Sequence, residues 1–259
     1  MLLLLRRLLF CCLLVAMAQA SAGEPVVIYL AGDSTLAAKL DAKRPETGWG
    51  EALPAYFGAS ARIDNRAQNG RSTRTFIAEG RWQAIVDTLR PGDFVLIEFG
   101  HNDASKEKVD RYTPPADYRA NLASFVDKVR ARRATPILLT PVARRKFAAS
   151  GALVDTHGEY PRIVREVAAQ KHVELIDMQR LSAAALLRLG AEPSRALFLQ
   201  LEPGEHPNYP NGIEDNTHFS PRGAALMAEL AVDAMRMQRL SLATYLKPTA
   251  DAPQPSTEK

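Results

Sequence analysis

Cysteine is almost missing from this sequence of 259 residues, which contains only Cys11 and Cys12. Both lie within residues 1–20, a segment with the features of a cleaved signal peptide, so we expect a mature chain without thiols or disulfides. This excludes a disulfide-stabilised scaffold and a thiol enzyme, and the hydrophobic core must stabilise the fold. The alternative is a lipoprotein anchored through one of these cysteines, but the bulky pair Leu9-Phe10 stands where a lipoprotein signal has small residues.

The sequence also lacks an apolar run long enough for a comfortable transmembrane span. The run from Leu8 to Met17 follows Arg6-Arg7 and ends in Ala18-Gln19-Ala20. This succession of positive, apolar and small residues predicts a secretory signal peptide, after which the mature chain begins near Ser21. We therefore expect export to the periplasm or the medium, with no stable membrane insertion of the mature protein.

A strong excess of charge of one sign is missing as well. The formal net charge is +4, and it falls to +2 when Arg6 and Arg7 are removed with the signal peptide. No run of lysine and arginine with interleaved aromatic residues occurs, so nothing indicates a nucleic-acid partner. With 46% hydrophobic and 24% charged residues the chain is globular. We expect one domain at residues 21–246, followed by a disordered tail at 247–259.

Segments with strand and helix patterns alternate along this domain. We predict strands at residues 26–30, 61–65, 94–99, 135–140 and 173–177. We predict helices at residues 49–57, 81–89, 114–133, 157–171, 178–189 and 219–240. The last helix has Ser220 as its N-cap and Pro221 at its first position. Such alternation predicts an α/β fold of three layers, in which helices cover both faces of a parallel sheet of about five strands.

Three of the predicted strands are followed by residues that could take part in chemistry. Ser34 comes after the first strand, within Ala31-Gly32-Asp33-Ser34-Thr35, while Gly70 follows the second strand and Asn102 the third. Right-handed crossovers place the carboxyl ends of parallel strands at one edge of the sheet, so these residues should meet there. We interpret Ser34 as a nucleophile. The alternative is a turn in which the serine side chain caps a helix.

A general base is available near the C-terminus, where Asp215 and His218 stand three residues apart before the last helix. On a tight turn this spacing puts both side chains on one face, where the carboxylate can orient the imidazole that activates a serine. A helix-capping or loop histidine is the alternative for His218. The other histidines suit this role less well, because His157 and His172 flank a predicted helix and are expected at the surface, and His206 lies in a polar loop.

Acyl transfer also needs hydrogen-bond donors for the oxyanion that forms on the substrate. The candidates are the backbone N–H groups of Ser34 and Gly70 and the side-chain amide of Asn102. Gly70 could instead be a turn glycine, and Asn102-Asp103 could be a turn capped by its own side chains. The expected mature chain has no thiols and no pair of histidines at helical ligand spacing, so we expect neither a metal nor a cofactor.

These blocks occur in the order found in the SGNH hydrolases, the GDSL-type esterase superfamily, which the chain resembles from Val26 to about Leu240. Within it, the chain is similar to the rhamnogalacturonan acetylesterases of carbohydrate esterase family twelve. The residues that carry this closer match are Tyr29-Leu30-Ala31-Gly32-Asp33-Ser34-Thr35, Gly48-Trp49-Gly50, Asn69-Gly70-Arg71-Ser72, Glu98-Phe99-Gly100-His101-Asn102-Asp103 and Glu214-Asp215-Asn216-Thr217-His218-Phe219.

The resemblance implies a flavodoxin-like SGNH hydrolase fold and a secreted serine esterase that needs no cofactor. It implies Ser34 as nucleophile, His218 as base and Asp215 as its orienting group, with Ser34, Gly70 and Asn102 forming the oxyanion hole. The implied reaction removes O-acetyl groups from plant cell-wall polysaccharide, acetylated rhamnogalacturonan or pectin above all. Thr35 stands where many members have leucine, which favours the polysaccharide-esterase branch over lipases.

Three alternatives stay open: an acetylxylan esterase, a general carboxylesterase or lipase of the same fold, and a non-catalytic carbohydrate-binding relative. Four residues are candidates for contact with an acetylated polysaccharide or oligosaccharide. Arg71 and Arg74 could pair with galacturonate carboxylates, unless they are simply solvated, and Tyr209 could stack on a sugar ring. His101 is expected to support the site through hydrogen bonds, and Trp49 is expected in the core. Nothing in the pattern indicates an oligomeric state.

Overall fold

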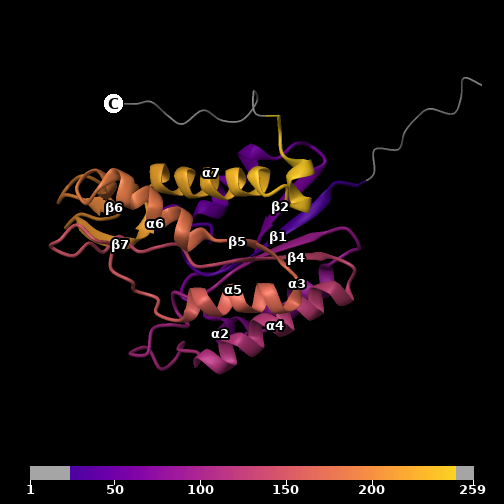
Figure 1. The fold of residues 1–259 in the computed structure, drawn as a ribbon. Helices are drawn as coiled ribbons and strands as arrows, with labels where there is room; N and C mark the ends of the chain where they lie inside the picture. The colour runs from indigo at the N-terminus through magenta and orange to yellow at the C-terminus, as the bar shows by residue number, and fades with distance from the viewer. Residues whose placement is uncertain (1–23, 249–259) are drawn as a thin grey trace, which may run out of the picture.

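Five parallel strands form the central sheet, in the order β2-β1-β3-β4-β5 (Figure 1). Their bounds are β1 Val26–Gly32, β2 Ala61–Asn65, β3 Phe94–Glu98, β4 Thr135–Leu139 and β5 Glu174–Ile176. The parallel pairing confirms the predicted α/β fold. The computed structural model describes residues 24–248, so the predicted signal peptide lies outside the described residues, as does the predicted tail except for its first two residues.

Helices cover both faces of the sheet and complete the three layers (Figure 1). One face carries α6 (Met178–Leu189) and α7 (Pro221–Met237). The opposite face carries α2 (Thr73–Ala78), α3 (Arg81–Thr88), α4 (Pro115–Ala131) and α5 (Tyr160–Lys171). No helix within residues 24–248 combines the length and the apolar character that crossing a membrane requires.

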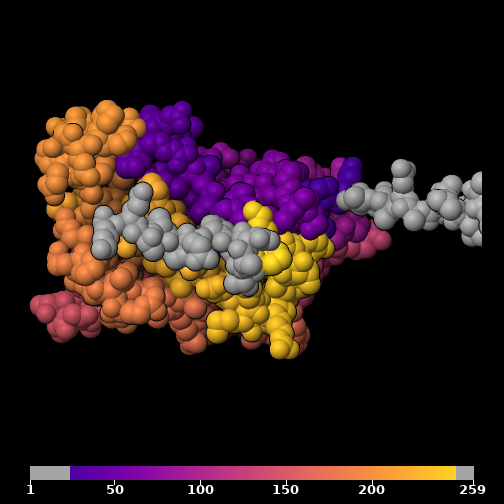
Figure 2. Space-filling view, turned by 90° about the horizontal axis from the view of Figure 1, so that it is seen from above, coloured from indigo at the N-terminus to yellow at the C-terminus, as the bar shows by residue number. Residues whose placement is uncertain are grey.

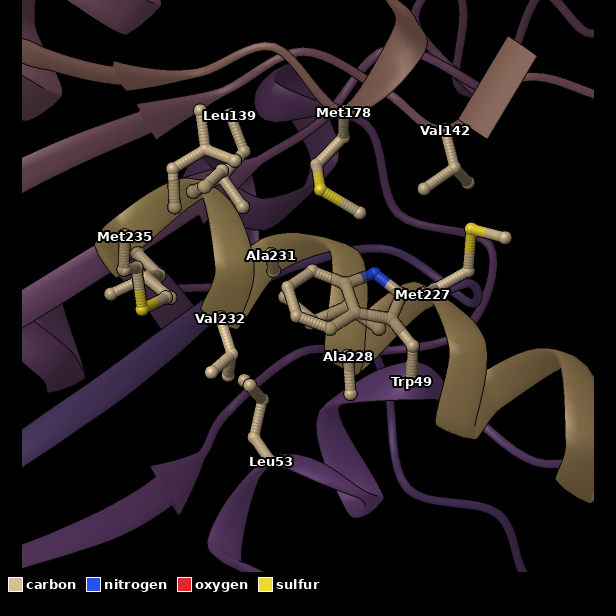
Figure 3. Packing of buried hydrophobic residues seen from close by; sticks show 14 of the residues in the cluster. Trp49, Leu53, Leu139, Val142, Met178, Met227, Ala228, Ala231, Val232 and Met235 are labelled. Carbon is tan, nitrogen blue, oxygen red and sulfur yellow. The ribbon is translucent and has the colours of Figure 1, made fainter. Parts of the chain in front are cut away.

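A hydrophobic core lies on each face of the sheet. Trp49 is fully buried against α7, where Met227, Ala231 and Met235 recur at helical spacing (Figure 3). On the other face, the rings of Trp82 and Phe125 stack with their centroids 3.9 Å apart. Because β3 is covered on both faces, all of its residues are buried, which accounts for its apolar sequence and makes Glu98 at its end an exception.

The N-terminus of α7 has the predicted cap. Ser220 Oγ accepts a hydrogen bond from the backbone N–H of Gly223 at 3.2 Å, and Pro221 occupies the first helical position. A Cβ atom at Gly223 would lie 1.8 Å from the carbonyl oxygen of Leu197, so only glycine allows this close approach. These contacts fix the start of α7 directly after the segment that carries His218.

Residues 49–57 do not form the predicted amphipathic helix. Two 3-10 turns, Trp49–Glu51 and Leu53–Tyr56, take its place. Glu51 Oε1 accepts the backbone N–H of Gly48 at 2.8 Å and closes the first turn, and Pro54 has no N–H with which to continue an α-helix. The prediction that Trp49 lies in the core is nevertheless confirmed.

A separate antiparallel pair, β6 (Phe198–Leu201) and β7 (Ile213–Phe219), stands beside the sheet and does not follow from the sequence pattern. The loop between them, residues 202–212, lies next to residues 41–44, to which Asn208 Nδ2 donates two hydrogen bonds of 2.7 and 2.9 Å. Figure 2 shows these orange and indigo segments side by side at one end of the molecule. This arrangement brings β7 to the carboxyl edge of the sheet.

Candidate active site

A cavity of about 460 Å³ opens where the ends of β1 and β3 face β7. Its lining includes Ser34, His101, Asn102, Arg144, Asp215 and His218. The expectation that residues after different strands meet at one edge is therefore correct for Ser34 and Asn102. The cavity is polar, since Ala104 contributes the only apolar side chain among the lining residues that the structure describes.

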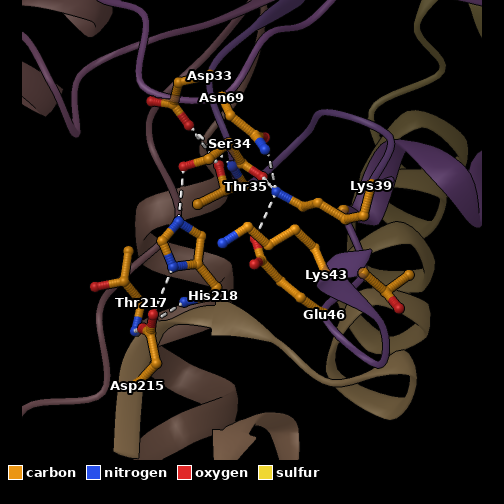
Figure 4. Close-up of polar contacts among 12 residues, drawn as sticks. Asp33, Ser34, Thr35, Lys39, Lys43, Glu46, Asn69, Asp215, Thr217 and His218 are labelled. Atoms are coloured by element: carbon orange, nitrogen blue, oxygen red, sulfur yellow. Dashed lines mark hydrogen bonds and ion pairs between the residues drawn. The ribbon is translucent and has the colours of Figure 1, made fainter. Parts of the chain in front are cut away.

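Ser34, His218 and Asp215 form one continuous chain of hydrogen bonds (Figure 4). Ser34 Oγ lies 2.9 Å from His218 Nε2, and His218 Nδ1 lies 2.6 Å from Asp215 Oδ2. An ionised carboxylate only accepts, so Nδ1 must carry the proton and Nε2 is left as the acceptor for the serine hydroxyl. The geometry has the two links that an activated serine needs: a base within reach, and a group that orients it.

Asp215 is held as an anion by its surroundings. Burial by itself raises the pKa of this carboxyl, but the hydrogen bond and charge of His218 outweigh burial and lower the pKa to about 2. Its Oδ1 atom also accepts the backbone N–H groups of Thr217 at 2.7 Å and His218 at 2.9 Å. The carboxylate therefore stays ionised at any pH near neutrality.

The predicted tight turn before α7 is wrong, because Asp215 and His218 belong to β7. Consecutive residues Phe198 and Leu199 of β6 pair with Phe219 and Asp215, so three residues of β7 bulge out of the ladder between them. The bulge, together with the backbone bonds to Asp215 Oδ1, brings both side chains to the same side. In a regular strand, by contrast, residues three apart point to opposite faces.

Two residues that sequence reasoning missed hold this bulge. Arg145 Nη1 donates to Asn216 Oδ1 at 2.8 Å, and the Arg145 backbone N–H donates to the Asn216 carbonyl at 2.9 Å. Gln200 Nε2, on β6, donates to the same Asn216 Oδ1 at 3.1 Å. The bulge is thus fixed from both neighbouring segments.

Asn102 lines the cavity together with Ser34, whereas Gly70 belongs to the neighbouring loop after β2. Asn102 is 8% exposed, and its Nδ2 donates one hydrogen bond of 3.0 Å to the Arg71 carbonyl, which leaves its second amide hydrogen for another acceptor. Gly70 has a positive φ of 74°, a conformation that favours glycine, and it is not among the residues that line the cavity. Its neighbours Asn69 and Arg71 are tied to Lys39 and Asn102 respectively.

Lys39 lies directly behind Ser34 and is a further residue that the sequence did not reveal (Figure 4). Its side chain is 0% exposed, and its ammonium forms an ion pair of 2.7 Å with Glu46. It also donates to the Ser34 carbonyl and, at 2.9 Å, to Asn69 Oδ1. All three N–H groups of the lysine thus have partners, and the lysine connects the Ser34 segment with the loop that contains Gly70.

Three buried carboxyl groups occupy the region around the end of β3. Burial raises the pKa of all three: the pKa of Glu98 rises to about 8 and that of Asp103 to about 7. The negative charge of Asp33 contributes to the shifts of Glu98 and Asp103. Glu98 accepts hydrogen bonds from Trp49 Nε1 at 2.7 Å and from the Val142 backbone N–H at 3.2 Å. A single acidic residue at the end of an apolar strand was a sequence signal for this buried role.

His157 is not at the surface, contrary to the prediction from its place beside a helix. It is 4% exposed, and its Nε2 lies 3.0 Å from His101 Nδ1. The helix α5 begins at Tyr160, so His157 lies in the connection that turns in toward the cavity. Burial lowers the pKa of His157 to about 3 and that of His101 well below its ordinary value, so both rings are neutral near pH 7.

The remaining predicted contact residues lie outside the lining of the cavity. Arg71 forms an ion pair of 3.0 Å with Glu79, and Arg74 Nη2 donates to the Val109 carbonyl at 2.7 Å. Tyr209 Oη donates to the Lys43 carbonyl at 3.0 Å. The arginine that does line the cavity is Arg144, in the connection between β4 and α5, and no local sequence pattern pointed to it.

Comparison with known proteins gives one consistent assignment. The model of the GDSL-like lipase/acylhydrolase family matches residues 30–226. The rhamnogalacturonan acetylesterase RhgT of Bacillus subtilis is 38% identical over 223 residues, which cover 86% of this chain and 95% of that protein. The rhamnogalacturonan acetylesterase of Emericella nidulans is 31% identical over 245 residues, which cover 86% of this chain and 89% of that protein.

Solved structures agree on the fold. The X-ray structure of the YXIM protein of Bacillus subtilis has a TM-score of 0.72 at 26% identity, and the match covers 84% of this chain and 58% of that chain. The acetylxylan esterase Axe2 of Geobacillus stearothermophilus has a TM-score of 0.59 at 20% identity, with 83% of this chain and 96% of that chain covered. Because the family match spans most of the chain, we conclude that the chain is a carboxylic ester hydrolase and belongs to the GDSL-like lipase/acylhydrolase family.

Proposed function

We propose that this protein is an exported serine esterase that removes O-acetyl groups from pectic polysaccharide of the rhamnogalacturonan type. The observation that carries the proposal is the hydrogen-bonded chain from Ser34 through His218 to Asp215 at the wall of a polar cavity. The names of the two curated relatives supply the substrate class. The signal-peptide pattern of residues 1–20 supports export, and N-terminal sequencing of protein recovered outside the cytoplasm tests it.

The proposed reaction assigns a step to each of these groups. His218 Nε2 takes the Ser34 hydroxyl proton while Oγ attacks the acetyl carbonyl carbon. The oxyanion is stabilised by the backbone N–H groups of Ser34 and Gly70 and the free amide hydrogen of Asn102. Protonated His218 then gives its proton to the departing sugar oxygen, which leaves an acetyl group on Ser34.

Water completes the cycle by the same steps in reverse order. His218 takes a proton from the water as it attacks the acetyl carbonyl, and the imidazolium returns that proton to Ser34 Oγ when acetate departs. Asp215 stays ionised throughout, because its pKa is held at about 2. Apart from the substrate and water, every group in this proposed reaction belongs to the chain itself.

The lining of the cavity bears on the alternative functions. A lipase would need apolar surface for an acyl chain, whereas the described lining has one apolar side chain, that of Ala104. A non-catalytic relative does not need the chain of hydrogen bonds at Ser34. An acetylxylan esterase is the second candidate, favoured by the polar lining, which suits a neutral sugar chain as well.

Acetate release from a panel of esters tests the function. We expect faster release from acetylated rhamnogalacturonan than from acetylated xylan, and slow cleavage of long-chain aryl esters. A higher kcat/KM for acetylated xylan would contradict the substrate assignment and leave the esterase mechanism in place. A preference for long-chain esters would contradict the polysaccharide assignment altogether.

A further inference from the structure

The cavity beside Ser34 has a cationic side that the proposed mechanism does not use. Arg144 and Lys108 line it, together with the acidic residues Glu107 and Asp215. The Asp215 carboxylate is paired with His218, with Oδ2 lying 2.6 Å from Nδ1. Glu107 and Lys108 are both exposed, so water screens their charges, whereas Arg144 is half-buried. Arg144 is therefore the cation whose charge acts most strongly inside the cavity.

The Arg144 guanidinium is held by neutral partners. Nη1 donates to the Thr156 carbonyl and Nη2 to the His101 carbonyl, each at 3.2 Å. Within residues 24–248 it forms no ion pair with a carboxylate, in contrast to Arg71 with Glu79 and Arg165 with Asp177. Burial lowers the pKa of Arg144, and the charges of Asp33, Glu107 and Asp215 oppose this shift without contacting the guanidinium as an ion pair. The two carbonyls fix the guanidinium plane and leave further N–H groups for a ligand.

A second polar side chain of the same cavity wall, His101, has one ring nitrogen without a hydrogen-bond partner. His101 is 4% exposed, and its Nε2 atom has no hydrogen-bond partner among the described residues, although its Nδ1 atom is paired with His157. The Nε2 atom is enclosed by the protein, so His101 acts on the cavity through its backbone carbonyl, which accepts Arg144 Nη2 and orients the guanidinium.

We propose that Arg144, held in place by the carbonyls of Thr156 and His101, forms a subsite that binds a uronate carboxylate of the acetylated chain while Ser34 attacks the ester. A guanidinium matches a carboxylate in shape and charge, which makes a singly charged carboxylate the fitting ligand. A doubly charged phosphate would bring excess negative charge close to Asp215 and Glu107. The inference rests on the proposed function and extends it, since it assigns acid recognition to Arg144 in place of Arg71 and Arg74.

The test compares two substrates that differ in the charge of their carboxyl groups. An acetylated rhamnogalacturonan oligosaccharide and the same oligosaccharide with its carboxylates methyl-esterified are assayed for acetate release. We expect kcat/KM of the wild type to be about tenfold to hundredfold higher for the acidic form, as a charged hydrogen-bonded contact implies. Arg144→Gln, which keeps a donor for the carbonyls, should bring this ratio close to one, and Arg144→Lys should lower it less.

The matched control is Arg130→Gln. Arg130 also donates to two backbone carbonyls, those of Lys171 and His172, but it lies at the end of α4 that precedes β4, at the opposite edge of the sheet. This variant should keep the wild-type ratio. Added salt should raise KM for the acidic substrate in the wild type and in Arg130→Gln, and much less in Arg144→Gln.

The outcomes separate the subsite from the proposed function. If the wild type prefers the acidic substrate and Arg144→Gln keeps the same ratio, the subsite is wrong and deacetylation stands. If the wild type releases no acetate from either substrate, the function is wrong, and the subsite is judged by whether unacetylated trigalacturonate inhibits hydrolysis of para-nitrophenyl acetate. Inhibition that Arg144→Gln abolishes supports the subsite, while absent or unchanged inhibition overturns it.

Discussion

Ser34 has a cavity side and a buried side, and the polar groups on the two sides differ in almost every physical respect. On the cavity side, His218 and Asp215 are partly exposed and come from a single short segment of β7. On the buried side, Lys39 is 0% exposed and its partner Glu46 11%, and the lysine joins two loops that are distant in sequence. The groups proposed to react are thus few and local, whereas the groups that position them are buried and come from several segments.

The two sides of Ser34 should respond differently to mutation. A change on the cavity side removes a proton acceptor or its partner and leaves the surrounding structure in place. A change on the buried side leaves the reacting groups present but moves the backbone that carries them, and it leaves a buried charge unpaired. Rate should therefore dominate the response on the cavity side, and rate and stability should change together on the buried side.

Apart from removal of the nucleophile itself, the largest effect is expected for Asp215→Asn. Asparagine can donate where the carboxylate only accepts, so it favours the wrong tautomer of His218 and no longer stabilises the imidazolium. We expect kcat to fall about 10²- to 10⁴-fold, with the thermal unfolding midpoint nearly unchanged. Steady-state kinetics on a soluble acetyl ester checks this. Undiminished turnover would mean that Asp215 only caps the β7 bulge.

A smaller effect is expected for the buried ion pair. The double variant Lys39→Met with Glu46→Gln removes the positioning lysine without leaving a buried carboxylate unpaired. We expect kcat to fall about tenfold to hundredfold with little change in KM, because the backbone at Ser34 and Gly70 loses its common anchor. Wild-type kcat in a folded double variant would show that Lys39 has a purely structural role, and Glu46→Gln alone separates the loss of the pair from the loss of the lysine.

The smallest effect on rate, but a distinct one on stability, is expected for Glu98→Gln. In the folded protein the Glu98 pKa is raised to about 8, so the folded state keeps a proton that an unfolded chain releases near its ordinary value of 4.5. The stability that this group contributes is therefore present at low pH and is lost as the pH rises from about 4.5 to 8. Glutamine resembles the protonated carboxyl and does not titrate.

Unfolding experiments across this pH range measure the difference. The free energy of unfolding of the wild type, taken relative to that of Glu98→Gln, should fall by roughly 1–3 kcal/mol between pH 5 and pH 8. Parallel pH profiles of the two proteins would show that Glu98 is already ionised in the folded state. The comparison with the variant cancels the opposite contribution of His157, whose low pKa favours the folded state as the pH rises.

The two sides of Ser34 also differ in how far the sequence predicts them. The alternation of strands and helices fixes which residues reach the carboxyl edge of the sheet, and the Asp215 and His218 pair is visible because its members are three residues apart. Lys39, Arg144 and His157 become neighbours of the site only through tertiary contacts, so no local pattern reveals them. Glu98 is intermediate, since one acid in an apolar strand signals burial but not its partners.

The two errors have different origins. The helix expected at 49–57 follows from apolar spacing, but Pro54 and the Glu51 cap divide it into two short turns. The tight turn expected at Asp215 is a bulged strand. It pairs with β6, and hydrophobic periodicity within the segment itself does not predict such a partner. The first error is therefore local in origin, whereas in the second the pairing with β6 decides the conformation.

The central claim is that Ser34 is the nucleophile of an acyl-enzyme reaction. Acid quenching of the enzyme during turnover of an acetyl ester, followed by mass spectrometry of its peptides, tests this claim most directly. We predict a mass increase of one acetyl group on the peptide that contains Ser34, absent from the Ser34→Ala variant, which should be folded and inactive. An acetyl group on another residue, or normal turnover by Ser34→Ala, would contradict the account.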